Sequence, residues 1–263
     1  MKRTARRKTV RRKFPIPVML AIVLLVFAGG IAAGGSGTPD HDLTGQENLS
    51  AQIPGSMESA PLPTPTPIPA SDKPVSEDNW ALTLVNWKYS LPENFSIPEF
   101  TQLRNGHSID SRAYPALQAM MDDARAARLQ PMICSSYRTG ATQERLFGQE
   151  VQSWLDRGYA REEATNRAAM WVARPGTSEH QTGLAVDIVD MSYQILDERQ
   201  ESTPVQKWLM VHCAEYGFIL RYPTDKSALT GINYEPWHYR YVGAEAAKEI
   251  MGNGLCLEEY LLR

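Results

Sequence analysis

Residues 178–187 read SEHQTGLAVD and join a histidine to an alternating extended segment that runs on to Ile188. Side chains alternate between the two faces of a strand, so Leu184, Val186 and Ile188 share one face and Asp187 lies on the other. A carboxylate inside an otherwise apolar strand is costly unless a partner satisfies it. The stretch therefore predicts a strand with one face in the core and one face that builds a site.

A second polar stretch, EPWHYRY at residues 235–241, supplies another of the five histidines in the chain. A catalytic zinc ion takes three protein ligands, histidine or carboxylate, and keeps a further position open for water. His180 ahead of the first strand, Asp187 within it and His238 on a later strand could provide such a set. A single histidine is more often structural, and three are interpreted in that way: His41, His107 and His212.

Glu235 lies three residues before His238, a spacing that would put the two side chains on opposite faces of a flat strand. Pro236 interrupts the strand ladder and lets the chain bend between them. The bend could turn both side chains towards one metal ion, with His238 as a ligand and Glu235 as a general base.

Helical and extended segments alternate around these motifs, without a regular βαβ rhythm. Apolar residues at Leu117, Met120, Met121 and Ala124 predict an amphipathic helix over 111–128. The pair Thr203-Pro204 predicts the start of a helix that stops at Gly217. Further predicted segments are strands at 132–135, 184–188, 218–222 and 237–242, and helices ending near Gly158 and spanning 161–172. The mixture favours an α+β fold, a small antiparallel sheet flanked by helices.

The chain before this domain divides by composition into three parts. Residues 1–13 carry eight Lys or Arg and no acid, and 14–33 carry no charge. About twenty apolar residues can cross a bilayer, and basic flanks stay cytoplasmic, so 14–34 is predicted to be a transmembrane anchor or a cleaved signal segment. Residues 35–78 are a linker, stiffened by PLPTPTPIP at 61–69, that spaces a domain over 79–263 from the membrane. The domain is expected to be extracytoplasmic, or secreted after cleavage.

The charge balance and the cysteines limit the possible partners. Beyond residue 13 the chain has 19 basic and 30 acidic residues, which argues against a nucleic-acid partner. Three cysteines are too few for a disulfide framework. Cys134 and Cys213 could pair outside the cell, or both could be small buried side chains. We expect a monomer.

Three segments, CSSYRT at 134–139 together with 178–187 and 235–238, resemble the VanY-type D-alanyl-D-alanine carboxypeptidases in sequence, order and separation. The resemblance covers most of residues 80–245. It implies the α+β fold shared with related zinc dipeptidases and with the hedgehog signalling domain. It also implies that His180, Asp187 and His238 bind zinc and that Glu235 is the catalytic base.

The resemblance further assigns Arg138 to the substrate carbonyl and the developing oxyanion, and Gln143 and Ser178 to the terminal carboxylate of the substrate. An exposed helix-surface glutamine and a local turn or cap serine are the alternatives for the last two. Trp237 and Tyr239 flank the third ligand and could wall the pocket or belong to the core, since aromatic residues are common in strands.

The implied activity is a zinc-dependent carboxypeptidase that removes the C-terminal D-Ala from peptidoglycan stem peptides. Two alternatives remain open at this point. One is an L,D-carboxypeptidase or endopeptidase on the same scaffold, because stereochemistry is read by the shape of the pocket. The other is a non-catalytic zinc module that binds the cell wall, although such a module would have no need of Glu235 beside the metal.

Overall fold

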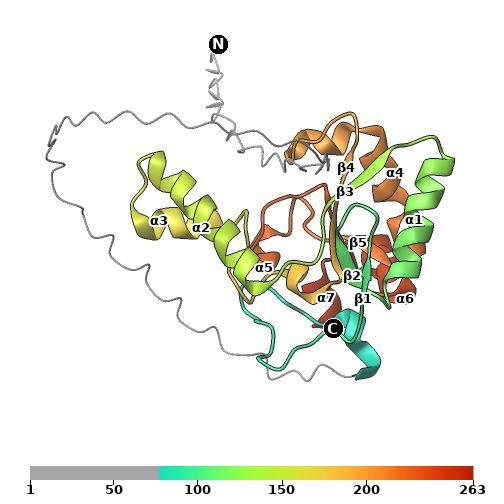
Figure 1. The fold of residues 1–263 in the computed structure, drawn as a ribbon, viewed down its shortest axis with the longest axis horizontal. Helices are drawn as coiled ribbons and strands as arrows, with labels where there is room; N and C mark the ends of the chain where they lie inside the picture. The colour runs from blue at the N-terminus through green and yellow to red at the C-terminus, as the bar shows by residue number, and fades with distance from the viewer. Residues whose placement is uncertain (1–76, 263) are drawn as a thin grey trace, which may run out of the picture. The chain divides into compact units, whose positions relative to one another are not determined.

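The computed structural model describes residues 77–262, which belong to one compact unit (Figure 1). The predicted basic tail at 1–13, the anchor or signal segment at 14–34 and all but the last residues of the 35–78 linker lie outside the described part. Among the described helices, none combines the length and the apolar character that crossing a bilayer requires.

A four-stranded antiparallel sheet forms the centre of the domain, with the strand order β3-β4-β6-β5. Its members are β3 (Pro131–Ser135), β4 (Ala185–Asp190), β5 (Phe218–Leu220) and β6 (His238–Tyr241). A separate antiparallel pair consists of β1 (Phe100–Gln102) and β2 (Ser108–Asp110). The α+β class and the antiparallel pairing are therefore confirmed, and the predicted strands end within two residues of those observed.

The main hydrophobic core lies on one face of this sheet. Val186 and Ile188 of β4 are fully buried there. They pack with residues of α1 (Tyr114–Ala126) and α4 (Pro204–His212). The four apolar positions that predicted the first helix are the four that α1 buries: Leu117, Met120, Met121 and Ala124.

The start of α4 was predicted correctly, and the predicted stop at Gly217 ends a 3-10 turn that continues the α-helix. The Thr203 hydroxyl accepts a hydrogen bond from the Gln206 backbone N–H, and Pro204 occupies the first turn. The α-helix then ends at His212, and a 3-10 turn, η4 (Cys213–Tyr216), continues to Gly217. Gly217 has a left-handed φ of 77° and marks the stop that the sequence predicted.

Two further layers complete the domain. The α2 (Gly140–Asp156) and α3 (Arg161–Ala169) helices pair around a cluster of their own that includes Val151 and Trp154, away from α1 in Figure 1. The C-terminal helices α6 (Ala244–Gly252) and α7 (Leu257–Leu261), which the sequence analysis did not predict, pack against Ile219 of β5. The remaining elements are η1 (Glu77–Leu82), η2 (Glu179–Thr182), η3 (Glu198–Ser202) and α5 (Ser227–Thr230).

The three cysteines are all free in the structure. Cys213 and Cys256 are buried and Cys134 is partly buried. Cys134 and Cys213 therefore do not form the disulfide considered as one alternative and are small unpaired side chains in the structure. Burial raises the pKa of the Cys213 thiol to about 12, which keeps it protonated and inert.

Candidate metal centre and active site

Strand register brings two of the three predicted metal ligands together. In the antiparallel pair of β4 and β6, Asp187 lies directly opposite His238. Side chains at opposed positions share a face of the sheet, with Cβ atoms about 5 Å apart. The first motif and the second, some fifty residues apart along the chain, therefore meet on the face opposite the main core.

The third residue, His180, reaches this face from η2, the short turn that leads into β4. The turn ends at Gly183, which has a left-handed φ of 70°. A Cβ atom at Gly183 would lie 2.9 Å from Ile97 Cδ1 and 3.2 Å from the Asp110 backbone nitrogen. Both the backbone conformation and the lack of space therefore require glycine at this position of the motif.

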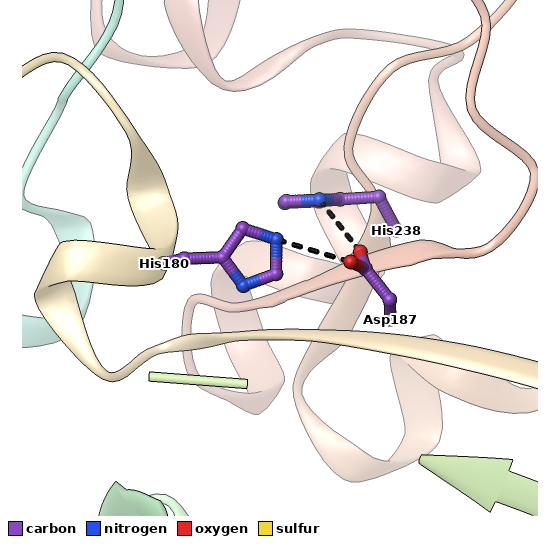
Figure 2. Close-up of side chains that lie close together, drawn as sticks. All are labelled: His180, Asp187 and His238. Carbon is purple, nitrogen blue, oxygen red and sulfur yellow. Dashed lines mark ion pairs between the residues drawn. The ribbon is translucent and has the colours of Figure 1, made fainter. Parts of the chain in front are cut away.

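The two imidazoles and the carboxylate converge on one point (Figure 2). His180 Nε2 lies 3.3 Å from Asp187 Oδ2, and His238 Nδ1 lies 3.1 Å from Asp187 Oδ1. One potential ligand atom from each residue falls within 4.8 Å of the others, and all three residues are buried. This is the arrangement that the sequence motifs predicted for a metal site.

The outer nitrogen of each ring faces an acceptor. His180 Nδ1 lies 2.8 Å from the Ser136 carbonyl oxygen, and His238 Nε2 lies 3.4 Å from Glu179 Oε2. Metal-binding histidines usually donate their second N–H to a carbonyl or carboxylate in this way. Asp187 Oδ1 is buried and receives no hydrogen bond from the described residues. Two imidazoles, a carboxylate with a free buried oxygen and outer acceptors on both rings fit a zinc ion.

Charge at this cluster is shaped by burial and by the neighbouring groups. Burial lowers the pKa of His180 to about 4. Burial would also lower the pKa of His238, but its contacts with Asp187 and Glu179 outweigh that effect and raise it to about 9. Burial opposes ionisation of Asp187, yet the two rings hold its pKa well below the usual range. At neutral pH the His180 ring is therefore neutral and Asp187 is ionised, the states in which these groups bind a metal.

Glu235 lies beside the three residues at the bend before β6. Its backbone carbonyl accepts a hydrogen bond from the His238 N–H at 3.2 Å, which closes a turn around Pro236. Glu235 Oε2 then lies 3.6 Å from His238 Nδ1, so the two side chains face the same centre, as predicted. Burial, only partly offset by His238, raises the pKa of Glu235 to about 8. A metal cation close by would work against that rise.

Arg138 is fixed by three neighbours on the same side of the cluster. Its Nε and Nη2 donate to Ser135 Oγ at 2.9 and 2.7 Å. Its Nη2 also donates to Asp187 Oδ2 at 3.0 Å, and its Nη1 to Gln143 Oε1 at 3.4 Å. The side chain keeps 20% of its surface exposed, so the guanidinium is both held in place and accessible.

Gln143 and Ser178 are both buried, and Gln143 contacts this arginine. Gln143 is not the exposed surface residue considered as its alternative, because its Nε2 donates to the Ala173 carbonyl at 2.7 Å. Ser178 occupies the N-cap position of η2 without a side-chain capping bond. Gln143 therefore adjoins Arg138, Ser178 lies two residues before His180 in the chain, and the contact of either with substrate stays a prediction.

Trp237 and Tyr239 take different positions. Trp237 is buried immediately before β6, and its carbonyl accepts the Ile188 N–H at 2.9 Å. Tyr239 lies in the main core on the opposite face from His238, with its hydroxyl donating to Gln206 Oε1 at 2.7 Å. The pocket-wall interpretation of Tyr239 is therefore wrong, because strand alternation turns a residue next to His238 away from the site. The ring of Tyr222 lies against His238 instead, with centroids 4.7 Å apart.

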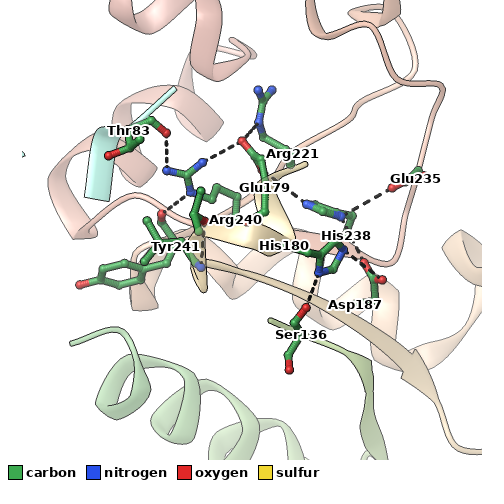
Figure 3. Close-up of polar contacts among 12 residues, drawn as sticks. Thr83, Ser136, Glu179, His180, Asp187, Arg221, Glu235, His238, Arg240 and Tyr241 are labelled. Carbon is green, nitrogen blue, oxygen red and sulfur yellow. Dashed lines mark hydrogen bonds and ion pairs between the residues drawn. The ribbon is translucent and has the colours of Figure 1, made fainter. Parts of the chain in front are cut away.

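Sequence reasoning missed Glu179, which sits between Ser178 and His180 in the first motif. It binds two fully buried arginines, Arg221 and Arg240 (Figure 3). The signal was available: Arg221 follows an apolar strand and Arg240 lies within one, and a buried cation demands a partner as much as Asp187 does. The partner itself could not be found without the fold.

Comparison with known proteins now identifies the family. Residues 106–244, just over half of the chain, match the model of the VanY family, D-alanyl-D-alanine carboxypeptidase. The chain belongs to this family. The match spans the three motifs and all four strands of the central sheet.

Proteins similar to this chain include a bacterial carboxypeptidase and two VanY proteins of solved structure. A D-alanyl-D-alanine carboxypeptidase of Enterococcus faecalis is 46% identical over 186 residues, which are 70% of this chain and 67% of that protein. The structure of VanYB in complex with D-alanine-D-alanine is 45% identical with a TM-score of 0.65, covering 70% of this chain and 98% of the other. A mutant of VanY from the VanB-type resistance cassette, in complex with Zn(II), is 45% identical with a TM-score of 0.64, covering 69% and 99%.

Proposed function

We propose that this VanY-family chain is a zinc-dependent carboxypeptidase that removes the terminal D-Ala from peptidoglycan stem peptides. The observation that carries the proposal is the buried convergence of His180, Asp187 and His238 with Glu235 beside them. The zinc ion in one similar VanY structure and the D-alanine-D-alanine in another support the metal and the substrate class. A wall-binding module without catalysis would not require a buried carboxylate at position 235.

Each side chain has a distinct task in this proposal. A zinc ion held by His180, Asp187 and His238 would supply a Lewis acid and lower the pKa of a water molecule. Glu235 takes the proton from the attacking water and delivers it to the leaving amine. Arg138, already fixed by Ser135, stabilises negative charge on the carbonyl oxygen, a contribution of about 3–4 kcal/mol for a preorganised donor.

A preference for cleavage at the C-terminus requires groups that bind the free terminal carboxylate of the substrate. We assign this task to Gln143, which contacts Arg138, and to Ser178, which lies two residues before His180; both side chains are buried. The Gln143 amide keeps one N–H beyond the one that it donates to Ala173, and the Ser178 hydroxyl is not used for capping. Leaving such a buried donor unpaired costs about 1–3 kcal/mol.

The test is digestion of defined stem peptides with mass analysis of the products. Loss of one Ala from a pentapeptide supports the proposal. Loss from a tetrapeptide alone would indicate an L,D-carboxypeptidase, and cleavage of a cross-link an endopeptidase. Amidating the C-terminus of the pentapeptide should lower kcat/KM about 100-fold or more. Ser178→Ala is the cleaner variant for this comparison, since Gln143→Ala also breaks the bond to Ala173.

We also propose that the enzyme is anchored in the cell membrane with its catalytic domain outside. The uncharged segment 14–34 behind a basic tail supports this location, and a wall polymer as substrate fits it. Fractionation without detergent should leave the full-length protein in the membrane, and protease added outside should release an active fragment. A mature N-terminus near residue 34 would show a cleaved signal and a secreted enzyme instead.

A further inference from the structure

The face of the sheet that carries the metal-site residues also holds a buried ion cluster. Glu179 pairs there with Arg221 and Arg240 (Figure 3), and Arg221 pairs in turn with Glu258. Glu179 and both arginines are completely inaccessible to solvent at their side chains. Buried charges are tolerated only with good geometry and full hydrogen bonding.

The two oxygens of Glu179 have different partners. Oε1 accepts from Arg221 Nε at 2.7 Å and from Arg240 Nη1 at 2.8 Å. Oε2 faces His238 Nε2 at 3.4 Å. Neither Glu179 Oε2 nor His238 Nε2 makes a hydrogen bond within the described residues, so two buried polar atoms without other partners face each other. The carboxylate thus uses one oxygen for the arginines and presents the other to the ring.

The arginines are themselves held from distant parts of the chain. Arg240 Nη2 donates to the backbone carbonyls of Ala81 and Thr83 at 2.9 and 2.7 Å. Arg221 donates to both oxygens of Glu258 in α7, at 2.9 and 2.7 Å. With both guanidiniums fixed in this way, Glu179 cannot turn its carboxylate without losing bonds to them.

A neutral imidazole carries its proton on one nitrogen only, and the other nitrogen binds a metal. We propose that Glu179 is a positioning residue that keeps the His238 proton on Nε2 and fixes the ring, so that Nδ1 offers its lone pair to the zinc ion. This inference rests on the proposed zinc site. A partner of this kind typically contributes about 10–100-fold to metal affinity.

The ion cluster supplies a matched control. Glu258 is as much a part of the cluster as Glu179, binding Arg221 and, through Oε1, the Asn86 amide at 2.8 Å. It is not a partner of His238. A role confined to holding buried charge together would make Glu179→Gln and Glu258→Gln equivalent, whereas a positioning role separates them.

The experiment measures zinc affinity by competition with a chromophoric chelator, using the full-length protein and both variants. Glu179→Gln should weaken zinc binding about 10–100-fold, because an amide cannot accept from two arginines and from His238 at once. Glu258→Gln should lower the thermal midpoint and leave zinc affinity unchanged. Equal affinity of Glu179→Gln and the wild type, or equal loss in both variants, would overturn the inference.

A second measurement does not depend on either variant folding. In zinc-loaded wild-type protein labelled with ¹⁵N-histidine, the His238 proton should be on Nε2, and the His180 proton on Nδ1, facing the Ser136 carbonyl. A His238 proton on Nδ1 contradicts the proposal. If the wild type does not bind zinc at all, the proposed metal site itself is wrong. If it binds zinc but the His238 proton is on Nδ1, only the role of Glu179 is wrong.

Discussion

The two faces of β4 and β6 are built from alternate residues of the same strands, yet they are held in different ways. Val186, Ile188 and Tyr239 pack into an apolar core on one face. Asp187, His238 and Arg240 lie on the other, where ion pairs and hydrogen bonds account for most of their polar atoms. One strand register serves both faces, since a slip of one residue would exchange them.

The largest effect that we expect is the loss of zinc binding when a metal ligand on the polar face is replaced. His180→Ala or His238→Ala should abolish zinc binding and reduce hydrolysis to background, because three ligands leave no redundancy. Metal analysis after dialysis measures it. His212→Ala is the control, since that ring is partly exposed, lies outside the site and pairs with Glu215 at 2.8 Å. Full zinc content in both site variants would contradict the assignment of this face.

Glu235 should separate catalysis from metal binding on the same face. Glu235→Ala should keep the fold and the zinc while kcat falls about 10²–10⁴-fold, the usual loss when a general base is removed. Steady-state kinetics and metal content together test this, with the exposed Glu245→Ala as a control. A near wild-type rate would mean that another group takes the proton.

The apolar face should give the smallest effect and no change in chemistry. Ile188→Val removes one buried methylene group next to Asp187 along the strand, and should lower the free energy of unfolding by about 0.5–1.5 kcal/mol. Urea denaturation measures the change, and Val211→Ala on the exposed side of α4 should stay within about 0.5 kcal/mol. Zinc affinity should be unchanged. A parallel loss of zinc affinity would show that the two faces are coupled.

Local pattern predicted most of the elements and the members of the site, for identifiable reasons. The buried side of α1 follows from the spacing of Leu117 and Met121, and Thr203 marks the start of α4 through its own hydroxyl. Asp187 stood out because a lone carboxylate in an apolar strand needs a partner. The same reasoning applied to Arg221 and Arg240 would have indicated a buried ion cluster, although it could not name Glu179.

Other features depended on contacts that no local pattern contains. From its place next to His238 in the sequence, Tyr239 could have walled the pocket or belonged to the core, and the pleat of β6 turns it into the core. The C-terminal helices were not predicted, although α7 contributes Glu258 to the ion cluster behind the site. Gln143 could have been exposed on α2, but it is buried, with Arg138 and the Ala173 carbonyl as hydrogen-bond partners.

The sequence by itself determined which side chains alternate, which turns need glycine and which residue types could bind a metal, because these properties depend on neighbours along the chain. Only the tertiary structure decided that Asp187 pairs with His238, that Glu179 faces the far nitrogen of the same ring and that Arg138 is held by Ser135. These are distances between strands and turns far apart in the chain. They are set by register and packing, which act on the whole fold at once.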